Sequence, residues 1–145
     1  MLNILFYILI IIISVIFMEI IAILSHKYIM HGPGWVLHKS HHIKARNQKD
    51  FELNDLYFIF FSSPSIFCII YGFLHSDYLF LAIGIGILMY GVIYVVLHDI
   101  MVHGRFGLKL SLNINYLKKI RKSHMKHHSC KEKNGATNFG FITYK

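Results

Sequence analysis

Three long apolar stretches dominate the chain and limit the folds that are open to it. They cover residues 2–24, 56–74 and 78–97, and Glu19 carries the only charged side chain within them. A helix of about 20 apolar residues crosses the hydrocarbon core of a bilayer. The sequence therefore predicts an all-α integral membrane protein with about three transmembrane helices. Only residues 75–77 separate the second stretch from the third, which predicts a tight helical hairpin.

The basic residues predict how these helices are oriented. All fifteen Lys and Arg side chains fall within residues 25–55 and 98–145, and three spans put these two segments on one side of the membrane. Because positively charged loops stay in the cytoplasm, the sequence predicts an external amino terminus and two cytoplasmic segments. The attraction of these two segments to anionic lipid headgroups explains why the chain has a formal net charge of +8. We therefore expect no nucleic-acid partner.

The first apolar stretch is also open to interpretation as a cleavable signal peptide. Such a peptide starts with positive charge, has a shorter apolar core and ends at small residues. Residues 1–3 carry no charged side chain, and residues 21–25 read IAILS, which is a poor cleavage site. We therefore expect a retained membrane anchor and a single domain over residues 1–145.

Ten of the eleven histidines form a duplicated pattern in the predicted cytoplasmic segments. An HxxxxH motif followed by an HxxHH motif occurs twice. Positions i, i+3 and i+4 cover only about 100° of an α-helix surface, so each HxxHH motif predicts a helix with three imidazoles on one face. A tail helix at about residues 115–128 would carry its lysines on the opposite face. The candidate metal ligands are His26, His31, His38, His41, His42, His98, His103, His124, His127 and His128.

The HxxxxH motifs need a different explanation. Residues i and i+5 point about 140° apart on a straight α-helix, so their imidazoles would not converge easily. Gly32-Pro33-Gly34 follows the first HxxxxH motif, and Gly104 follows the second. We expect each helix to end there and to bend its last histidine back toward the first.

Clustered histidines point to metal binding. Ten protonated imidazoles would repel one another, whereas metals bind the neutral form. Structural zinc takes four ligands, often with cysteine, so two metals with four or five imidazoles each fit better. Imidazole suits iron, zinc, copper and nickel, and hydrolysis by zinc stays open. A nitrogen-rich site just inside a membrane favours oxygen activation on a lipid-soluble substrate.

The order of motifs resembles that of the bacterial β-carotene hydroxylases, within the membrane fatty-acid hydroxylase and sterol desaturase superfamily. Similarity extends beyond the histidines to Met18-Glu19, HKYIMHG at 26–32, FELNDLY at 51–57 and LHDIMVHGRF at 97–106. NFGF at 138–141 resembles the closing SFGF of that family, with Asn138 in place of serine. The similarity covers nearly the whole chain.

The resemblance implies a reaction and its cofactors. It implies O2-dependent hydroxylation of carotenoid β-ionone rings at carbon 3, converting β-carotene through β-cryptoxanthin to zeaxanthin. It also implies a centre of two Fe ions held by the ten motif histidines, with no catalytic residue beyond the metals. Electrons would come from a ferredoxin-type donor, at the cytoplasmic face of a bacterial inner membrane. An oligomer that encloses the long substrate stays open.

Other functions remain alternatives. A hydroxylase or desaturase of fatty acyl or sterol chains would use a similar centre. A carotenoid ketolase is disfavoured, because the ketolases have a different histidine series without the repeated HxxxxH. A metal transporter, from a different class, would place its ligands at the bilayer midplane. The predicted spans hold no histidine, and the ten motif histidines lie beyond their ends.

Two acidic residues are candidates to support the metal ligands from behind. Glu19 lies seven residues before His26, about 20° away around the helix, and an ionisable group within a span favours function. Asp99 adjoins His98 and could orient it or bind metal itself. Glycines 84, 86 and 91 lie inside the third stretch, where we expect them to allow close helix packing.

Overall fold

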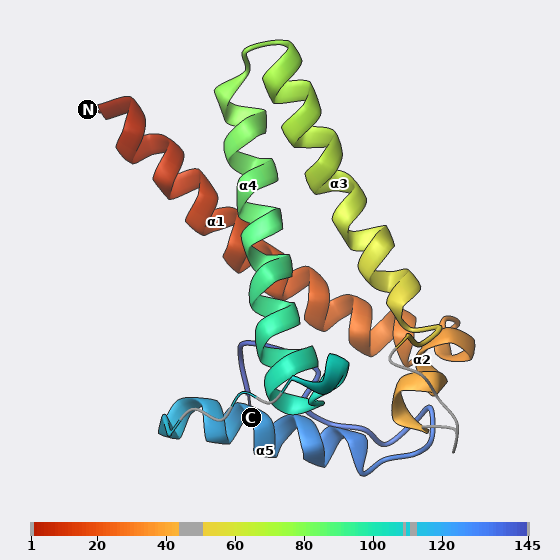
Figure 1. The fold of residues 1–145 in the computed structure, drawn as a ribbon. Coiled ribbons are helices and arrows are strands. Elements are labelled where there is room, and N and C mark those ends of the chain that lie inside the picture. The colour runs from red at the N-terminus through yellow and green to blue at the C-terminus, as the bar shows by residue number, and fades with distance from the viewer. Residues whose placement is uncertain (1, 44–50, 109, 111–112, 145) are drawn as a thin grey trace.

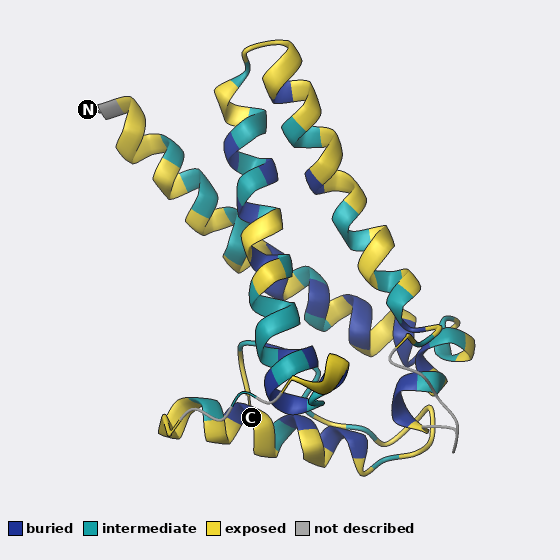
Figure 2. Cartoon of the chain, in the orientation of Figure 1, coloured by how far each residue is buried: buried dark blue, intermediate teal, exposed yellow. Residues whose placement is uncertain are grey.

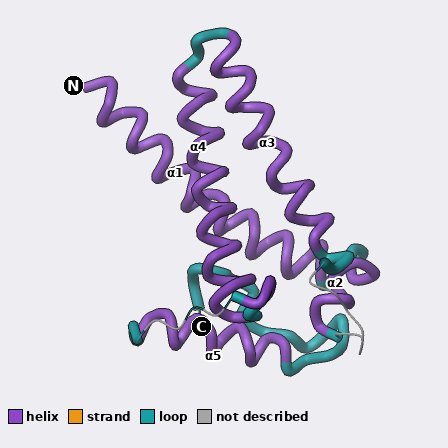
Figure 3. Tube along the Cα trace, viewed as in Figure 1, coloured by secondary structure: helices purple, strands orange, loops and turns teal. Residues whose placement is uncertain are grey.

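The computed structural model describes residues 2–43, 51–108, 110 and 113–144, and the regular structure in these ranges is entirely helical (Figures 1 and 3). Three helical segments are long and apolar enough to cross a membrane: Asn3–Met30, Asp55–Leu74 and Tyr78–Val102. The predicted fold class, an all-α membrane protein with three spans, is therefore confirmed.

The first span consists of α1 (Leu2–Ser25) continued by a π-helical turn, η1 (His26–Met30). The hairpin consists of α3 (Asp55–Leu74) and α4 (Tyr78–Tyr94), and α4 continues into a π-helix, η2 (Val95–Val102). The Asp77 carboxylate accepts the backbone N–H groups of Leu79 and Phe80 at 3.0 and 3.2 Å, which caps the start of α4. The helices begin and end within a few residues of the predicted apolar stretches.

Glycines let these helices approach closely at two of the three positions expected. A Cβ on Gly84 would lie 2.7 Å from the side chain of Ile69 on α3, and one on Gly86 would lie 2.5 Å from Ser14 on α1. Contacts this close need glycine. Gly91 differs, because a Cβ there would meet no atom within 4 Å. The expectation of close packing is therefore wrong for Gly91.

The remaining helices gather at one end of the spans (Figure 1). They are α2 (Trp35–His42), the short 3-10 turn η3 (Arg105–Gly107) and α5 (Asn115–His128). The predicted tail helix is confirmed, and so are its two faces. Ile120, His124, His127 and His128 are buried, whereas Lys118, Lys119, Lys122 and Lys126 are exposed.

Burial in this protein is inverted relative to that of a water-soluble domain. The spans expose rows of large apolar side chains, which suit a lipid environment, while the buried residues concentrate at the end that holds α2 and α5 (Figure 2). The side chains with the least exposure at that end are imidazoles: His26, His38, His42 and His127. The best-buried part of the molecule is thus polar, which requires specific partners for each group.

Candidate metal centre

The ten predicted histidines come together in two groups, each of which could hold a metal ion. The first histidine group consists of His26, His31, His38, His42 and His127. The second histidine group consists of His41, His98, His103, His124 and His128. In each group the ligand atoms lie within 4.8 Å of one another.

Each HxxHH helix contributes to both groups, which the sequence pattern did not reveal. On α2, His38 and His42 belong to the first group and His41 to the second. On α5, His127 belongs to the first group, and His124 and His128 belong to the second. The helices α2 and α5 therefore tie the two groups together, and neither group can form without both of them.

Distances between ring nitrogens indicate the coordination geometry. In the first group, Nε2–Nε2 distances are 3.0 Å for His26–His38 and 3.1 Å for His42–His127. In the second group, the His41–His98 distance is 3.0 Å. Around a metal about 2.1 Å from each nitrogen, ligands at a right angle lie about 3.0 Å apart and a tetrahedral pair about 3.4 Å apart. The measured Nε2–Nε2 distances are those of nitrogens that can bind one metal ion together.

The hydrogen bonds of the rings fit a cation at each group. Nδ1 of His26 donates to the carbonyl oxygen of Phe139 at 2.9 Å, and Nδ1 of His38 donates to Asn54 Oδ1 at 2.7 Å. A neutral imidazole has one N–H, so each Nε2 then carries only a lone pair. Two such lone pairs face each other at 3.0 Å, and a positive ion between them removes their repulsion.

The helices end at Met30 and Val102, next to the last histidine of each HxxxxH motif, as expected. The HxxxxH pairs converge, however, through widened helical turns and not through bent helix ends. The N–H of His31 donates to the carbonyl of His26 at 2.9 Å, and the N–H of His103 donates to that of His98 at 3.1 Å. These i to i+5 bonds define π-helical turns, which are rare and concentrate at functional sites. The extra residue per turn brings both imidazoles to one side, with ring centroids 5.3 Å apart for His26 and His31.

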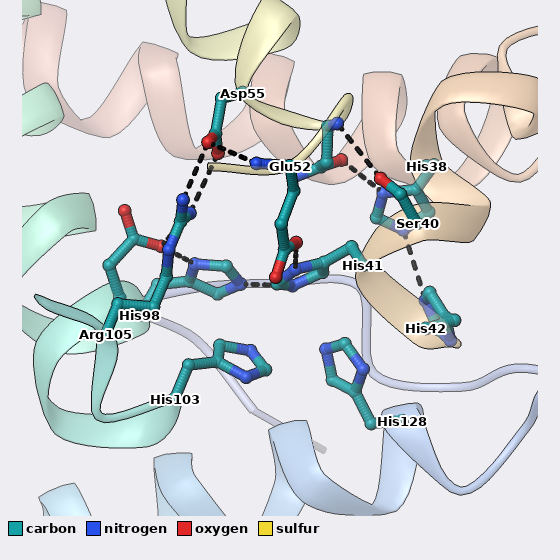
Figure 4. Close-up of polar contacts among 12 residues, drawn as sticks. His38, Ser40, His41, His42, Glu52, Asp55, His98, His103, Arg105 and His128 are labelled. Atoms are coloured by element: carbon teal, nitrogen blue, oxygen red, sulfur yellow. Dashed lines mark hydrogen bonds and ion pairs between the residues drawn. The ribbon is translucent and has the colours of Figure 1, made fainter. Parts of the chain in front are cut away.

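Acidic and amide side chains hold the histidines next to the spans (Figure 4). Nδ1 of His41 donates to Glu52 Oε2 at 2.7 Å, and Nδ1 of His98 donates to Asp99 Oδ1 at 2.7 Å. Asp99 thus lies behind His98, the supporting position that the sequence suggested. Glu52 and Asn54 were missed as supports, although both lie in the FELNDLY segment whose similarity to the family was noted.

Arg105 ties these supports to α3. Its guanidinium donates to both carboxylate oxygens of Asp55, at 2.6 and 2.8 Å, and lies 3.5 Å from Asp99 Oδ1. Such a two-point contact fixes the position of the guanidinium. The hydrogen bonds and the charges raise the pKa of Arg105 above its usual value, against the effect of burial.

Backbone carbonyls of the chain after α5 hold four histidines of the first group. Their Nδ1 atoms donate to carbonyl oxygens within residues 130–139, at 2.7 to 2.9 Å: His26 to Phe139, His31 to Lys133, His42 to Cys130 and His127 to Thr137. A carbonyl can come from any residue type, so no sequence signal identifies these partners. The segment fixes the ring tautomers, as partners behind metal ligands do.

Glu19 anchors the same segment. Its Oε1 accepts the backbone N–H groups of Phe141, Ile142 and Thr143 at 2.8 to 3.1 Å, and its Oε2 accepts the hydroxyl of Tyr90 at 2.8 Å. Phe141 in turn stacks on His26, with ring centroids 5.2 Å apart. Glu19 therefore contacts His26 through Phe141, whereas the sequence suggested only that Glu19 supports a metal ligand from behind.

An apolar cavity of about 470 Å³ lies between α1, α3 and α4, and some of its wall residues contact the histidines. Its wall includes Asn54, Tyr94 and Phe141. Asn54 accepts the His38 N–H, Tyr94 stacks on His98 with centroids 4.5 Å apart, and Phe141 stacks on His26. The cavity has a size typical of ligand sites, and its wall residues contact both histidine groups.

Burial keeps the histidines neutral. Desolvation lowers the pKa of His38 to about 3, although its hydrogen bond to Asn54 acts in the opposite direction. Desolvation likewise lowers the pKa of His127 to about 3 and that of His42 to about 4, against the effect of their carbonyl partners. These rings are therefore in the neutral, metal-binding form at pH near 7.

The metal-free protein should lose stability in acid. Unfolded histidines have a pKa near 6.5, so as pH falls below that value the unfolded chain binds protons that the folded chain does not. The free energy of unfolding is therefore highest above about pH 6.5 and falls as the pH drops toward 4. We expect the thermal unfolding midpoint of metal-free protein in detergent micelles to fall steadily over this range. A midpoint that is flat between about pH 7 and 5 would contradict this assignment.

These features define a class: an integral membrane protein with a buried, histidine-rich site suited to metal ions. The sequence model of the fatty acid hydroxylase family matches residues 11–145. The beta-carotene hydroxylase of Pantoea ananas is 41% identical over 134 residues, which cover 92% of this chain and 75% of that protein. The chain belongs to the fatty acid hydroxylase family and is an oxidoreductase, and the resemblance found in the sequence is confirmed.

Other relatives extend this similarity. The beta-carotene hydroxylase of a Paracoccus species is 36% identical over 135 residues, covering 92% of this chain and 82% of that protein. The chloroplastic beta-carotene 3-hydroxylase 2 of Arabidopsis thaliana is 39% identical over 119 residues, covering 80% of this chain and 39% of that protein. No solved structure matches the chain.

Proposed function

We propose that this protein hydroxylates carotenoid β-ionone rings at carbon 3, with O2 as the oxidant. One oxygen atom enters the ring C–H bond as a hydroxyl group, and two electrons and two protons convert the other into water. The observation that carries this proposal is the apolar cavity whose wall residues Phe141 and Tyr94 each stack on a histidine, one from each group. The names of the bacterial and plant relatives supply the substrate class.

The ten histidines fit two iron ions, five imidazoles to each. The Nε2 atoms converge within each group, so the five imidazoles of each group would hold one ion. Two irons bound there would supply the activation of O2. Glu52, Asn54 and Asp99 hold the rings in the tautomer that directs Nε2 inward. They are positioning residues, and the carbonyls of residues 130–139 act in the same way.

The cavity positions the ring and excludes water. Its wall is built from apolar and aromatic side chains of α1, α3 and α4, and two serines that line it already donate their hydroxyls to backbone carbonyls. A second apolar cavity of about 590 Å³ shares Met18, Phe61 and Ile87 with the first and extends along α1 away from the histidines. Together they suit a long apolar molecule with one end at the metals.

The proposal includes a location and an electron source. With the amino terminus outside, the histidine end lies at the cytoplasmic face of a bacterial inner membrane. The lysines of α5 are exposed, and α5 lies at the end of the spans (Figure 1), so a soluble ferredoxin-type protein with a negative surface could approach them. Electrons would then enter through the helix that carries His124, His127 and His128.

Pigment chromatography tests this function. Bacterial cells that accumulate β-carotene would express the chain, with its presence in the membrane, its iron content and a compatible electron donor verified. We expect β-cryptoxanthin and zeaxanthin to appear. Unchanged β-carotene under these conditions would contradict the carotenoid assignment and favour fatty acyl or sterol chains. A keto product in place of a hydroxylated one would show a ketolase.

A further inference from the structure

The apolar cavity next to the histidines opens sideways toward the lipid. Four of its lining residues are large, exposed apolar side chains: Phe58 and Ile66 on α3, and Leu88 and Val92 on α4. They are between 45% and 56% exposed. An apolar molecule dissolved in the bilayer can therefore enter the cavity between α3 and α4 without crossing water.

Gly91 lies in the middle of the α4 wall of this cavity. Ile87, Leu88, Tyr94 and Val95, its neighbours three and four residues away on the helix surface, all line the cavity. A Cβ at Gly91 would meet no atom within 4 Å. Gly91 therefore faces open space, unlike Gly84 and Gly86, which touch neighbouring helices.

The position of Gly91 relates the cavity to the histidines. Gly91 lies one helical turn before Tyr94, which lines the cavity and stacks on His98 with ring centroids 4.5 Å apart. An end group that approaches the metals along α4 passes this residue. Glycine destabilises a helix interior relative to alanine, and no close contact here requires it.

We propose that Gly91 is a specificity-determining residue that keeps the cavity wide enough for a bulky cyclic end group. The missing side chain leaves room beside α4 through which the ring moves from the lipid to the histidines. A larger residue would fill that room and admit only slimmer chains. This inference rests on the proposed function, because it concerns the substrate of the same site.

The test compares Gly91→Leu and Gly91→Ala with Met89→Phe, all three on α4. Met89 is 47% exposed and does not line the cavity, so the change there adds bulk on the lipid side as a control. Each protein would be purified from cells that accumulate β-carotene. Bound pigment, metal content and the rate of hydroxylation with a supplied electron donor would be measured.

We expect Gly91→Leu to lower both bound β-carotene and its hydroxylation by about tenfold or more, since even one methylene in an apolar pocket changes rates that much. Its metal content should equal that of the unaltered chain, and Met89→Phe should stay within about twofold. Gly91→Ala adds one carbon to the same wall and should show a smaller loss than Gly91→Leu. Unchanged pigment binding by Gly91→Leu would overturn the inference, whether or not its rate falls. An unaltered chain that binds pigment but forms no hydroxylated product would instead overturn the proposed function.

Discussion

Replacing His127 by alanine is expected to abolish hydroxylation and to remove the metal from the first histidine group. The His127 side chain is fully buried, and its Nε2 lies 3.1 Å from those of both His31 and His42. Partners behind metal ligands typically contribute 10–100-fold, so loss of a ligand itself should lower activity by at least about a hundredfold. Elemental analysis of purified protein and product chromatography measure the two effects.

His75→Ala is the matched control for this change. His75 lies in the exposed turn between α3 and α4, at the opposite end of the spans from the histidine groups. We expect this variant to keep its metal and its activity. A His127→Ala protein with full metal content and full activity would contradict the ligand assignment.

Replacing Glu19 by alanine should have the largest effect on stability. The change removes the acceptor of three backbone N–H groups and of the hydroxyls of Tyr90 and Thr143. Buried donors left without partners cost about 1–3 kcal/mol each, so we expect a loss of at least about 3 kcal/mol in the free energy of unfolding. Denaturant titration in micelles measures the loss.

The same variant should release the segment that follows α5. Phe141 would lose its N–H acceptor and its stacked position on His26, and the carbonyls that orient the first histidine group would become less well ordered. Limited proteolysis should then cleave beyond residue 128. Glu19→Gln keeps an acceptor oxygen and should show a smaller loss. Equal stability of Glu19→Ala and the unaltered protein would refute the anchoring role.

The periodic features of this chain could be predicted from the sequence, whereas contacts between residues far apart in the sequence could not. Apolar length fixed the three spans, and the i, i+3, i+4 spacing fixed the helix Asn115–His128 and its buried face. The π-helical turns were missed, because HxxxxH on an α-helix gives no sign that the turn widens. These turns are recognised only in the structure, from the backbone hydrogen bonds that the N–H groups of His31 and His103 donate to the carbonyls of His26 and His98.

The partners of the histidines were the least predictable part of the site. Asp99 was found because it adjoins His98 in sequence. Glu52 and Asn54 are eleven and sixteen residues from their histidines, and the carbonyl of Phe139 is 113 residues from His26. Gly91 was grouped with Gly84 and Gly86, since the three look alike in an apolar stretch, and only the surrounding space distinguishes them.

Hydroxylation of β-carotene under oxygen gas enriched in oxygen-18 tests the central claim most directly. Purified, iron-loaded protein in micelles would be given β-carotene and a reduced electron donor, and mass spectrometry would measure the label in the product. We expect each new hydroxyl group to carry oxygen-18, with none incorporated in a parallel reaction that uses labelled water. Unlabelled hydroxyl groups under labelled gas, or the absence of any product from iron-loaded protein, would contradict the account.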